Sequence, residues 1–153
     1  MQTKHFLVIL CLLFTCTGFA QNKLFEKFAD MDSVTSVYIS KAMFQMIPSV
    51  ERVGVSLMNM KGKIESLQLV STSKQDRKAQ MKKEFSQLVT SQHQELMRVK
   101  DEKTRINFYS NMKGDQVKDL IMLVEDEDSY TAILLVGNFT LKDIQDIANK
   151  EKK

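Results

Sequence analysis

Two groups of polar residues have types and spacing that could support chemistry, and the first is an acidic run. Four consecutive carboxylates, Glu125 to Asp128, lie between two strongly apolar runs. Carboxylate oxygens at the tip of a loop suit a hard cation such as calcium. The run lacks the spacing of an EF-hand and contains no glycine. We therefore favour a solvated turn, whose charges keep two apolar strands soluble, over a calcium site.

The second group is centred on His93, which lies close to Glu95 in Gln92-His93-Gln94-Glu95. A histidine beside a carboxylate can act as an acid or a base, but catalysis also needs a nucleophile or a second histidine. The chain contains no GxSxG, HExxH or phosphate-binding glycine loop. We therefore expect His93 to lie at a helix end or on the surface. We predict a non-enzymatic protein without catalytic residues, cofactor or metal.

A basic segment is a candidate for binding rather than catalysis. Apolar residues at helical spacing predict a long helix from Lys74 to about Ser91, and Ser73 with Asp76 has the spacing of a capping box. The opposite face of this helix is basic, and it is either solvated or in contact with anionic lipid headgroups or an acidic protein. The residues of this candidate interaction surface are Lys74, Arg77, Lys78, Lys82 and Lys83.

Methionine thioethers can bind copper, and the chain contains 10 methionines. They are spread over many predicted elements instead of being clustered, so we expect them to fill the core. The methionines concerned are Met43, Met46, Met58, Met60, Met81, Met97, Met112 and Met122.

Residues 1–20 have the pattern of an export signal. Lys4 and His5 form a short basic region, an apolar core follows from Phe6 to Phe14, and small residues precede Gln21. We predict cleavage between Ala20 and Gln21. The apolar core is well short of the ~20 residues of a membrane-spanning helix, and we expect no transmembrane segment in the mature chain.

Both cysteines, Cys11 and Cys16, lie inside this segment. The residues before Cys16 match poorly the small residues that a bacterial lipoprotein peptidase prefers, so we do not expect lipidation there. Cleavage after Ala20 would leave a chain without cysteine, which excludes disulfides, thiol nucleophiles and cysteine-based metal sites. We expect an exported protein that is periplasmic or associated with the outer membrane.

The strongest structural pattern is the stretch from Val117 to Thr140. Its two apolar runs, LIMLV and YTAILLV, flank the acidic turn and predict an antiparallel hairpin at the centre of a sheet. Thr140 and Asp143 have the spacing of a capping box for a last helix, with Phe139 and Ile144 as a hydrophobic staple.

The other elements follow from the same periodicities. We predict helices at Asn22 to Met31 and Lys41 to Ile47, the second of them capped by Ser40. The segment from Ser49 to Leu57 is compatible with a helical turn or an interrupted strand. Further strands are predicted at Val34 to Ile39, Ile64 to Val70, Leu96 to Lys100 and Arg105 to Tyr109.

Together these elements predict the fold class. Strands joined by short turns are antiparallel, so we expect an α+β, two-layer sandwich. Its largely antiparallel sheet would end in a C-terminal meander of two consecutive hairpins covered by helices. With one proline and no linker, residues 21–153 are predicted to form a single α+β domain. A net charge of only +3 argues against nucleic-acid binding.

Several stretches resemble a known family. VTSVYISKAM from Val34, the strand LIMLV and the closing GNFTLKDI are the most specific, and the similarity covers nearly the whole predicted mature chain. They resemble the domain of unknown function 4252, a family of secreted Bacteroidota proteins. The resemblance implies export but no assigned activity. It also implies gene neighbours among extracytoplasmic sigma factors and anti-sigma proteins, and thus a link to envelope-stress signalling.

Two functional hypotheses follow. The first is an exported cell-envelope protein that binds another envelope protein or the membrane surface through an edge strand or the basic helix. The alternative is a carrier for a small apolar or lipid-like ligand held between the sheet and the helices, as an interior rich in Phe and Met would permit.

Overall fold

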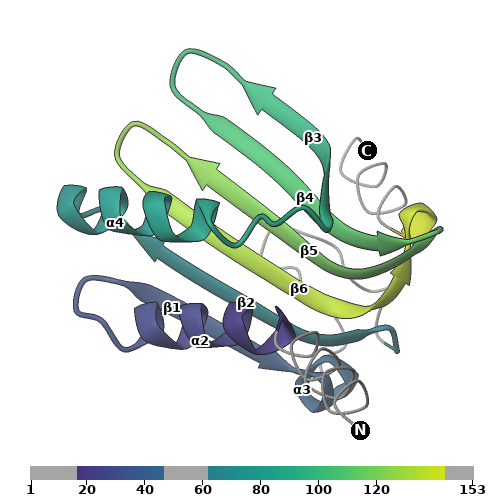
Figure 1. The fold of residues 1–153 in the computed structure, drawn as a ribbon. Coiled ribbons are helices and arrows are strands. Elements are labelled where there is room, and N and C mark those ends of the chain that lie inside the picture. Colours follow the sequence, from purple (N-terminus) through teal and green to yellow (C-terminus); the bar gives the residue numbers. More distant parts are fainter. Residues whose placement is uncertain (1–16, 47–61, 144–153) are drawn as a thin grey trace, which may run out of the picture.

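The computed structural model of the protein describes residues 17–46 and 62–143, which form a six-stranded antiparallel sheet with helices packed on it (Figure 1). The predicted α+β class is confirmed. Residues 1–16, the ambiguous segment Ser49 to Leu57 and the staple residue Ile144 lie outside the described residues. The elements in chain order are α2 (Thr17–Ala29), β1 (Thr35–Ser40), α3 (Lys41–Met46), β2 (Ile64–Thr72), α4 (Gln75–Ser86), β3 (His93–Lys100), β4 (Arg105–Lys113), β5 (Gln116–Glu125) and β6 (Tyr130–Thr140).

The strand order in the sheet is β1-β2-β6-β5-β4-β3, and every neighbouring pair is antiparallel. The two apolar strands β5 and β6 therefore occupy the centre, as the sequence predicts for Val117 to Thr140. A tight turn joins them, in which the Asp126 N–H donates to the Ser129 carbonyl over 2.9 Å. A central strand is covered on both faces, which is why both runs are almost continuously apolar.

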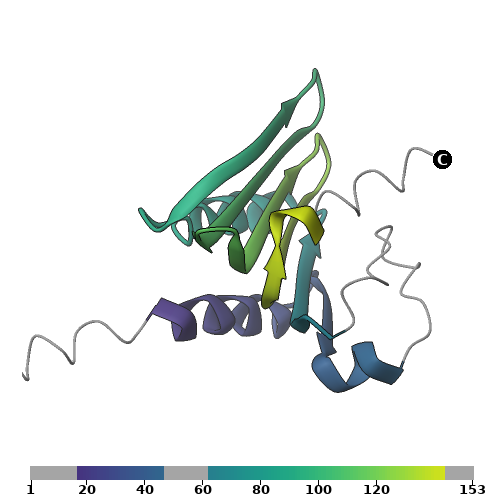
Figure 2. The same cartoon turned by 90° about the vertical axis from the view of Figure 1, so that its right-hand side faces the viewer.

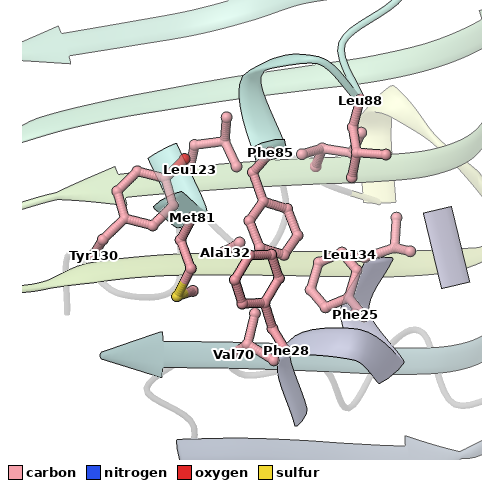
Figure 3. Packing of buried hydrophobic residues seen from close by; sticks show 11 residues of the cluster. Phe25, Phe28, Val70, Met81, Phe85, Leu88, Leu123, Tyr130, Ala132 and Leu134 are labelled. Carbon is pink, nitrogen blue, oxygen red and sulfur yellow. The ribbon is translucent and has the colours of Figure 1, made fainter. Parts of the chain in front are cut away.

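Helices α2 and α4 pack on the same face of this sheet, which we call the helix-covered face (Figure 1). Phe25 and Phe28 of α2 meet Phe85 of α4, with ring centroids 4.9 and 5.3 Å apart. Figure 3 shows these rings and Met81 lying over β6 and β2. The strand residues Val70, Ile121, Leu123, Tyr130, Ala132 and Leu134 complete this buried cluster. Burial of large aromatic side chains is the main force that holds the helices on the sheet.

The opposite side of the sheet, the second face, is also apolar. Directly paired residues of antiparallel strands point to the same face, so the register defines which side chains are neighbours. One row crosses all strands: Val37, Leu69, Ile133, Met122, Phe108 and Met97. Among the described residues, Phe44 of α3 and Leu141 pack against one end of this face. In Figure 2, α3 and α2 lie at different sides of the sheet.

Several predicted helix ends need correction. Helix α2 begins at Thr17 and not Asn22, so it runs through the predicted cleavage position. Helix α4 spans only Gln75–Ser86, and its N-cap is Lys74, without a side-chain cap from Ser73. Instead, the Thr72 hydroxyl accepts the Lys74 N–H over 3.2 Å. The apolar pattern continues beyond α4 because Leu88 packs into the helix-covered core after the helix has ended.

Two predicted caps are confirmed. The Ser40 hydroxyl accepts the Met43 N–H over 3.4 Å at the start of α3. At the end of β6, the Asp143 carboxylate accepts the Thr140 N–H over 2.8 Å, and the Thr140 hydroxyl accepts the Asp143 N–H over 3.3 Å. Lys63 also donates to Asp143 over 2.8 Å. These hydrogen bonds, that from Lys63 first, lower the pKa of Asp143.

Candidate functional site

The basic helix and the acidic turn, two separate candidates in the sequence, meet in the fold. Helix α4 lies over the turn between β5 and β6, and its Lys78 ammonium donates to the backbone carbonyls of Asp126 and Glu127, the latter over 2.8 Å. One helical turn further on, the Lys82 Nζ lies 2.7 Å from a carboxylate oxygen of Glu125. Residues four apart share a helix face, so Lys78 and Lys82 form one stripe against the turn.

The predicted basic surface is therefore divided. Lys78 and Lys82 satisfy charges and carbonyls within the protein, and the half-buried Arg77 donates to Gln80 over 2.9 Å. Lys74 and Lys83 are exposed. The structure thus brings three of the five predicted residues to partners within the protein, two of them to the acidic turn, instead of presenting all five to an external partner.

We expect a solvated acidic turn from the sequence, but carboxylates of this turn also have partners within the protein. The Asp126 carboxylate accepts the Thr104 hydroxyl over 2.7 Å and the Ser129 hydroxyl over 3.4 Å. The Nζ of Lys103 lies 3.2 Å from a carboxylate oxygen of Glu127. In residues 17–46 and 62–143, no group of three or more His, Cys, Asp or Glu side chains could hold a metal ion. The carboxylates of the described turn stabilise the turn itself and its contact with α4.

The side chain of His93 is buried, so the predicted surface position is wrong. It is the first residue of β3, its side chain is only 3% exposed, and its Nε2 lies 3.3 Å from a carboxylate oxygen of Asp119 on β5. The strand register shifts between Val117 and Asp119. This bulge leaves Val117 in the cluster of the second face while Asp119 reaches His93 on the helix-covered face.

Hydrogen bonds determine what this pair can do. The Nδ1 of His93 accepts the Thr90 N–H over 3.2 Å and lies 3.0 Å from the Thr90 hydroxyl. With Nδ1 as the acceptor, the proton of the neutral ring lies on Nε2, 3.3 Å from a carboxylate oxygen of Asp119. The Gln21 amide nitrogen of α2 lies 3.3 Å from the same Nε2. Since both ring nitrogens are engaged, His93 has no free lone pair for general-base catalysis.

The buried position also affects the pKa of Asp119. Burial raises the pKa of Asp119, while His93, the Asn111 N–H and Gln21 act in the opposite direction. The cluster joins α2, the loop before β3 and strand β5. Little in the sequence indicates this cluster, because Gln21, His93 and Asp119 are far apart in the chain and none of them belongs to a motif.

Comparison with known families identifies the chain. The family model "Domain of unknown function (DUF4252)" matches residues 25–147. The chain belongs to this family. The searches of curated proteins and of solved structures gave no significant match. Membership of DUF4252 names no activity, so the function has to be argued from the molecule.

The methionines of this DUF4252 chain do not all fill its core. Met81 is completely buried, as we had expected, but Met43, Met46 and Met97 are exposed. Met58 and Met60 lie outside the described residues. Exposed Met97 lies at the end of the apolar row on the second face.

The interior on the helix-covered face is filled by the chain's own side chains. Phe25, Phe28, Met81 and Phe85 are at most 2% exposed and pack together over the strands (Figure 3). A groove of about 390 Å³ borders this core, between α2 and the strands β1 and β2, and includes Tyr38 in its lining. None of the helices in residues 17–46 and 62–143 is long and apolar enough to span a membrane.

Proposed function

We propose that the protein is an exported, non-enzymatic interaction module of the cell envelope, which binds another protein through the second face of its sheet. The N-terminal pattern of residues 1–20 supports export. The engagement of both His93 ring nitrogens within the protein supports a non-enzymatic role. The resemblance to secreted proteins encoded near sigma and anti-sigma factors supports a place in envelope-stress signalling.

The row of apolar side chains across the second face is the observation that carries this proposal. It has one member from every strand, and its ends remain accessible: Val37 is 39% and Met97 47% exposed. The neighbouring Val99 on β3 is also exposed. Contiguous apolar patches on soluble proteins mark interaction sites more often than scattered single residues do.

The second face is a better candidate than the basic helix. Lys78 and Lys82 are engaged by the acidic turn, and releasing them would leave carbonyls and a carboxylate without these donors. Exposed basic residues on a helix are also usual for a solvated surface. The apolar row has no such internal partner among its described neighbours at the β3 end.

Site-specific photocrosslinking in the envelope tests this proposal. A photoreactive phenylalanine analogue replaces Phe108, on the second face, or Asn107, its neighbour on β4 that points to the other face. We expect a reproducible protein adduct from position 108 and none from position 107. Equal adducts from both positions, or none from position 108, would count against the second face as the binding surface.

Export has its own measurement. N-terminal sequencing of the protein recovered from the envelope should give Gln21 as the first residue. Recovery of the uncleaved chain from the cytoplasm would contradict the proposed location, whatever the crosslinking shows.

A further inference from the structure

The two edges of the sheet differ in how they are protected against pairing with another strand. Strand β3 forms one edge, and it carries Glu95, Arg98 and Lys100 and a register shift between Glu95 and Met97. Charged side chains and bulges are the usual devices that keep an edge strand from pairing. The β3 edge is therefore protected against pairing with another strand.

Strand β1 forms the other edge and has none of these devices. Its sequence, TSVYIS, contains no charge, proline or glycine, and its pairing with β2 runs without a register shift. Its outer side has no strand partner among the described residues. Tyr38 is 67% exposed. An exposed, regular and uncharged edge is a template for strand addition.

The sequence of β1 indicates what pairs with it. From Ser36 to Ser40 it reads Ser-Val-Tyr-Ile-Ser, which is polar, apolar, aromatic, apolar and polar in both directions. An antiparallel pair related by a two-fold axis joins identical segments in opposite directions, so it requires this symmetry of the sequence. We propose that β1 pairs with β1 of a second copy of this chain, antiparallel, with Tyr38 on the two-fold axis.

The register follows from the faces of the sheet. Paired residues must point to the same face, so the axis has to pass through a residue and not between two residues. With the axis at Tyr38, Val37 pairs with Ile39 of the second copy, and Ser36 with Ser40. An axis at Val37 would instead place Thr35 against Ile39, a polar residue against an apolar one. The axis at Tyr38 is the better match.

The surroundings of β1 agree with this arrangement on both faces. On the second face, Val37 is the last member of the apolar row, so pairing with Ile39 of the second copy continues the row into that copy. On the helix-covered face, Tyr38 borders the groove of about 390 Å³ between α2 and the strands, whose lining includes Phe25, Ala29 and Val70. This groove offers room for the second tyrosine ring, and aromatic cross-strand pairs stabilise sheets.

Sedimentation with two matched valine variants tests the surface. Val37 on β1 and Val99 on β3 lie on the same face of opposite edge strands and are 39% and 42% exposed. We expect a reversible dimer for the wild type. Val37→Lys should weaken it at least tenfold, because a lysine would be desolvated at the interface, and Val99→Lys should leave it unchanged. Circular dichroism of each variant verifies that it is folded.

Cysteine crosslinking tests the register. In the full chain with Cys11→Ser and Cys16→Ser, the introduced residue is the only cysteine. Directly paired Cα atoms lie about 4.5–5.5 Å apart, within the range of a disulfide, so Tyr38→Cys should form a disulfide-linked dimer under mild oxidation. Ser36→Cys should not, because its two copies would be roughly 13 Å apart along the strands.

The outcomes are decisive in both directions. A wild-type protein that stays monomeric at millimolar concentration would overturn the proposal, as would equal weakening by Val37→Lys and Val99→Lys. Efficient crosslinking through Ser36→Cys but not Tyr38→Cys would overturn the axis at Tyr38. Envelope adducts at position 108 are independent of all these results, because Phe108 lies on β4, far across the sheet from β1.

Discussion

At the scale of single residues, the pair of His93 and Asp119 is built to hold elements together. Both ring nitrogens of His93 are used, by Thr90 on one side and by Asp119 on the other. Asp119 is nearly buried, and its pKa is raised because burial disfavours the charged form. Placing a carboxylate there costs stability whenever it is ionised, which gives the protein a measurable pH dependence.

The variant Asp119→Asn makes this dependence visible. A raised pKa in the folded chain means that the folded state holds the proton more tightly than the unfolded state. The resulting contribution to the free energy of unfolding is present below the ordinary pKa of about 4 and is lost as the pH rises through the raised value. The stability of wild type relative to Asp119→Asn should therefore fall as the pH rises from about 4 in urea titrations.

Asp101→Asn is the matched control for this measurement. Hydrogen bonds from the Thr104 and Lys103 N–H groups lower the pKa of Asp101, so its contribution is present above about pH 4 and is lost below it. The difference in the free energy of unfolding between Asp101→Asn and wild type should stay constant from about pH 4 upward. Repeating Asp119→Asn with His93→Gln removes the titratable side chain in contact with Asp119. If the difference in the free energy of unfolding between wild type and Asp119→Asn did not change with pH, it would contradict a raised pKa of Asp119.

Gly137 is required for the close approach of two backbones. A Cβ at this position would lie 2.3 Å from the Lys63 carbonyl oxygen, which also accepts the Asn138 N–H over 2.8 Å. Gly137→Ala should lower the free energy of unfolding by about 1–3 kcal/mol, as overpacking does. Gly62→Ala has open space around the new methyl group and should stay within about 1 kcal/mol of wild type. Equal effects of the two variants in urea unfolding would show that the approach is not tight.

At the scale of elements, the contact between α4 and the β5–β6 turn explains why the two most highly charged segments face each other. Lys78 caps backbone carbonyls of the turn, whereas Lys83 is exposed. Lys78→Met keeps the apolar stem but removes the donor, and should cost about 1 kcal/mol. Lys83→Met should change the free energy of unfolding by less than about 0.5 kcal/mol. A thermal or urea comparison that ranks Lys83→Met as the more harmful would contradict the assigned contacts.

Elements could be predicted from the sequence where local pattern and burial coincide. The pattern predicts β5 and β6 at the centre correctly, because a strand covered on both faces is apolar throughout. The same pattern predicts too late an end for α4, because periodicity indicates which side chains are buried and not where the helix ends. Leu88 is buried beyond the helix, so the pattern continues through it.

At the scale of the whole molecule, neighbours that are distant in sequence could not be predicted. The bulge between Val117 and Asp119 changes which face Asp119 occupies, and no local signal announces such a bulge. The contact of His93 with Asp119 depends on it. Likewise, the sequence predicts two independent charged segments around Lys82 and Glu125, because only the strand order brings α4 over the turn.

The strand order also predicts how stability is distributed over the sheet. Strands β5 and β6 are hydrogen-bonded to a neighbouring strand on both sides, whereas β1 and β3 each have one side without a strand partner in the described part of the chain. Local opening requires the least free energy where fewest contacts are lost. In hydrogen–deuterium exchange of dilute protein, peptides of β5 and β6 should exchange slowest and those of β1 and β3 fastest. Raising the protein concentration should slow β1 alone, because β3 is blocked by charge and a bulge and β1 is the edge that pairs. Slowing of β3 with concentration, or exchange in β6 as fast as at the edges, would contradict this distribution.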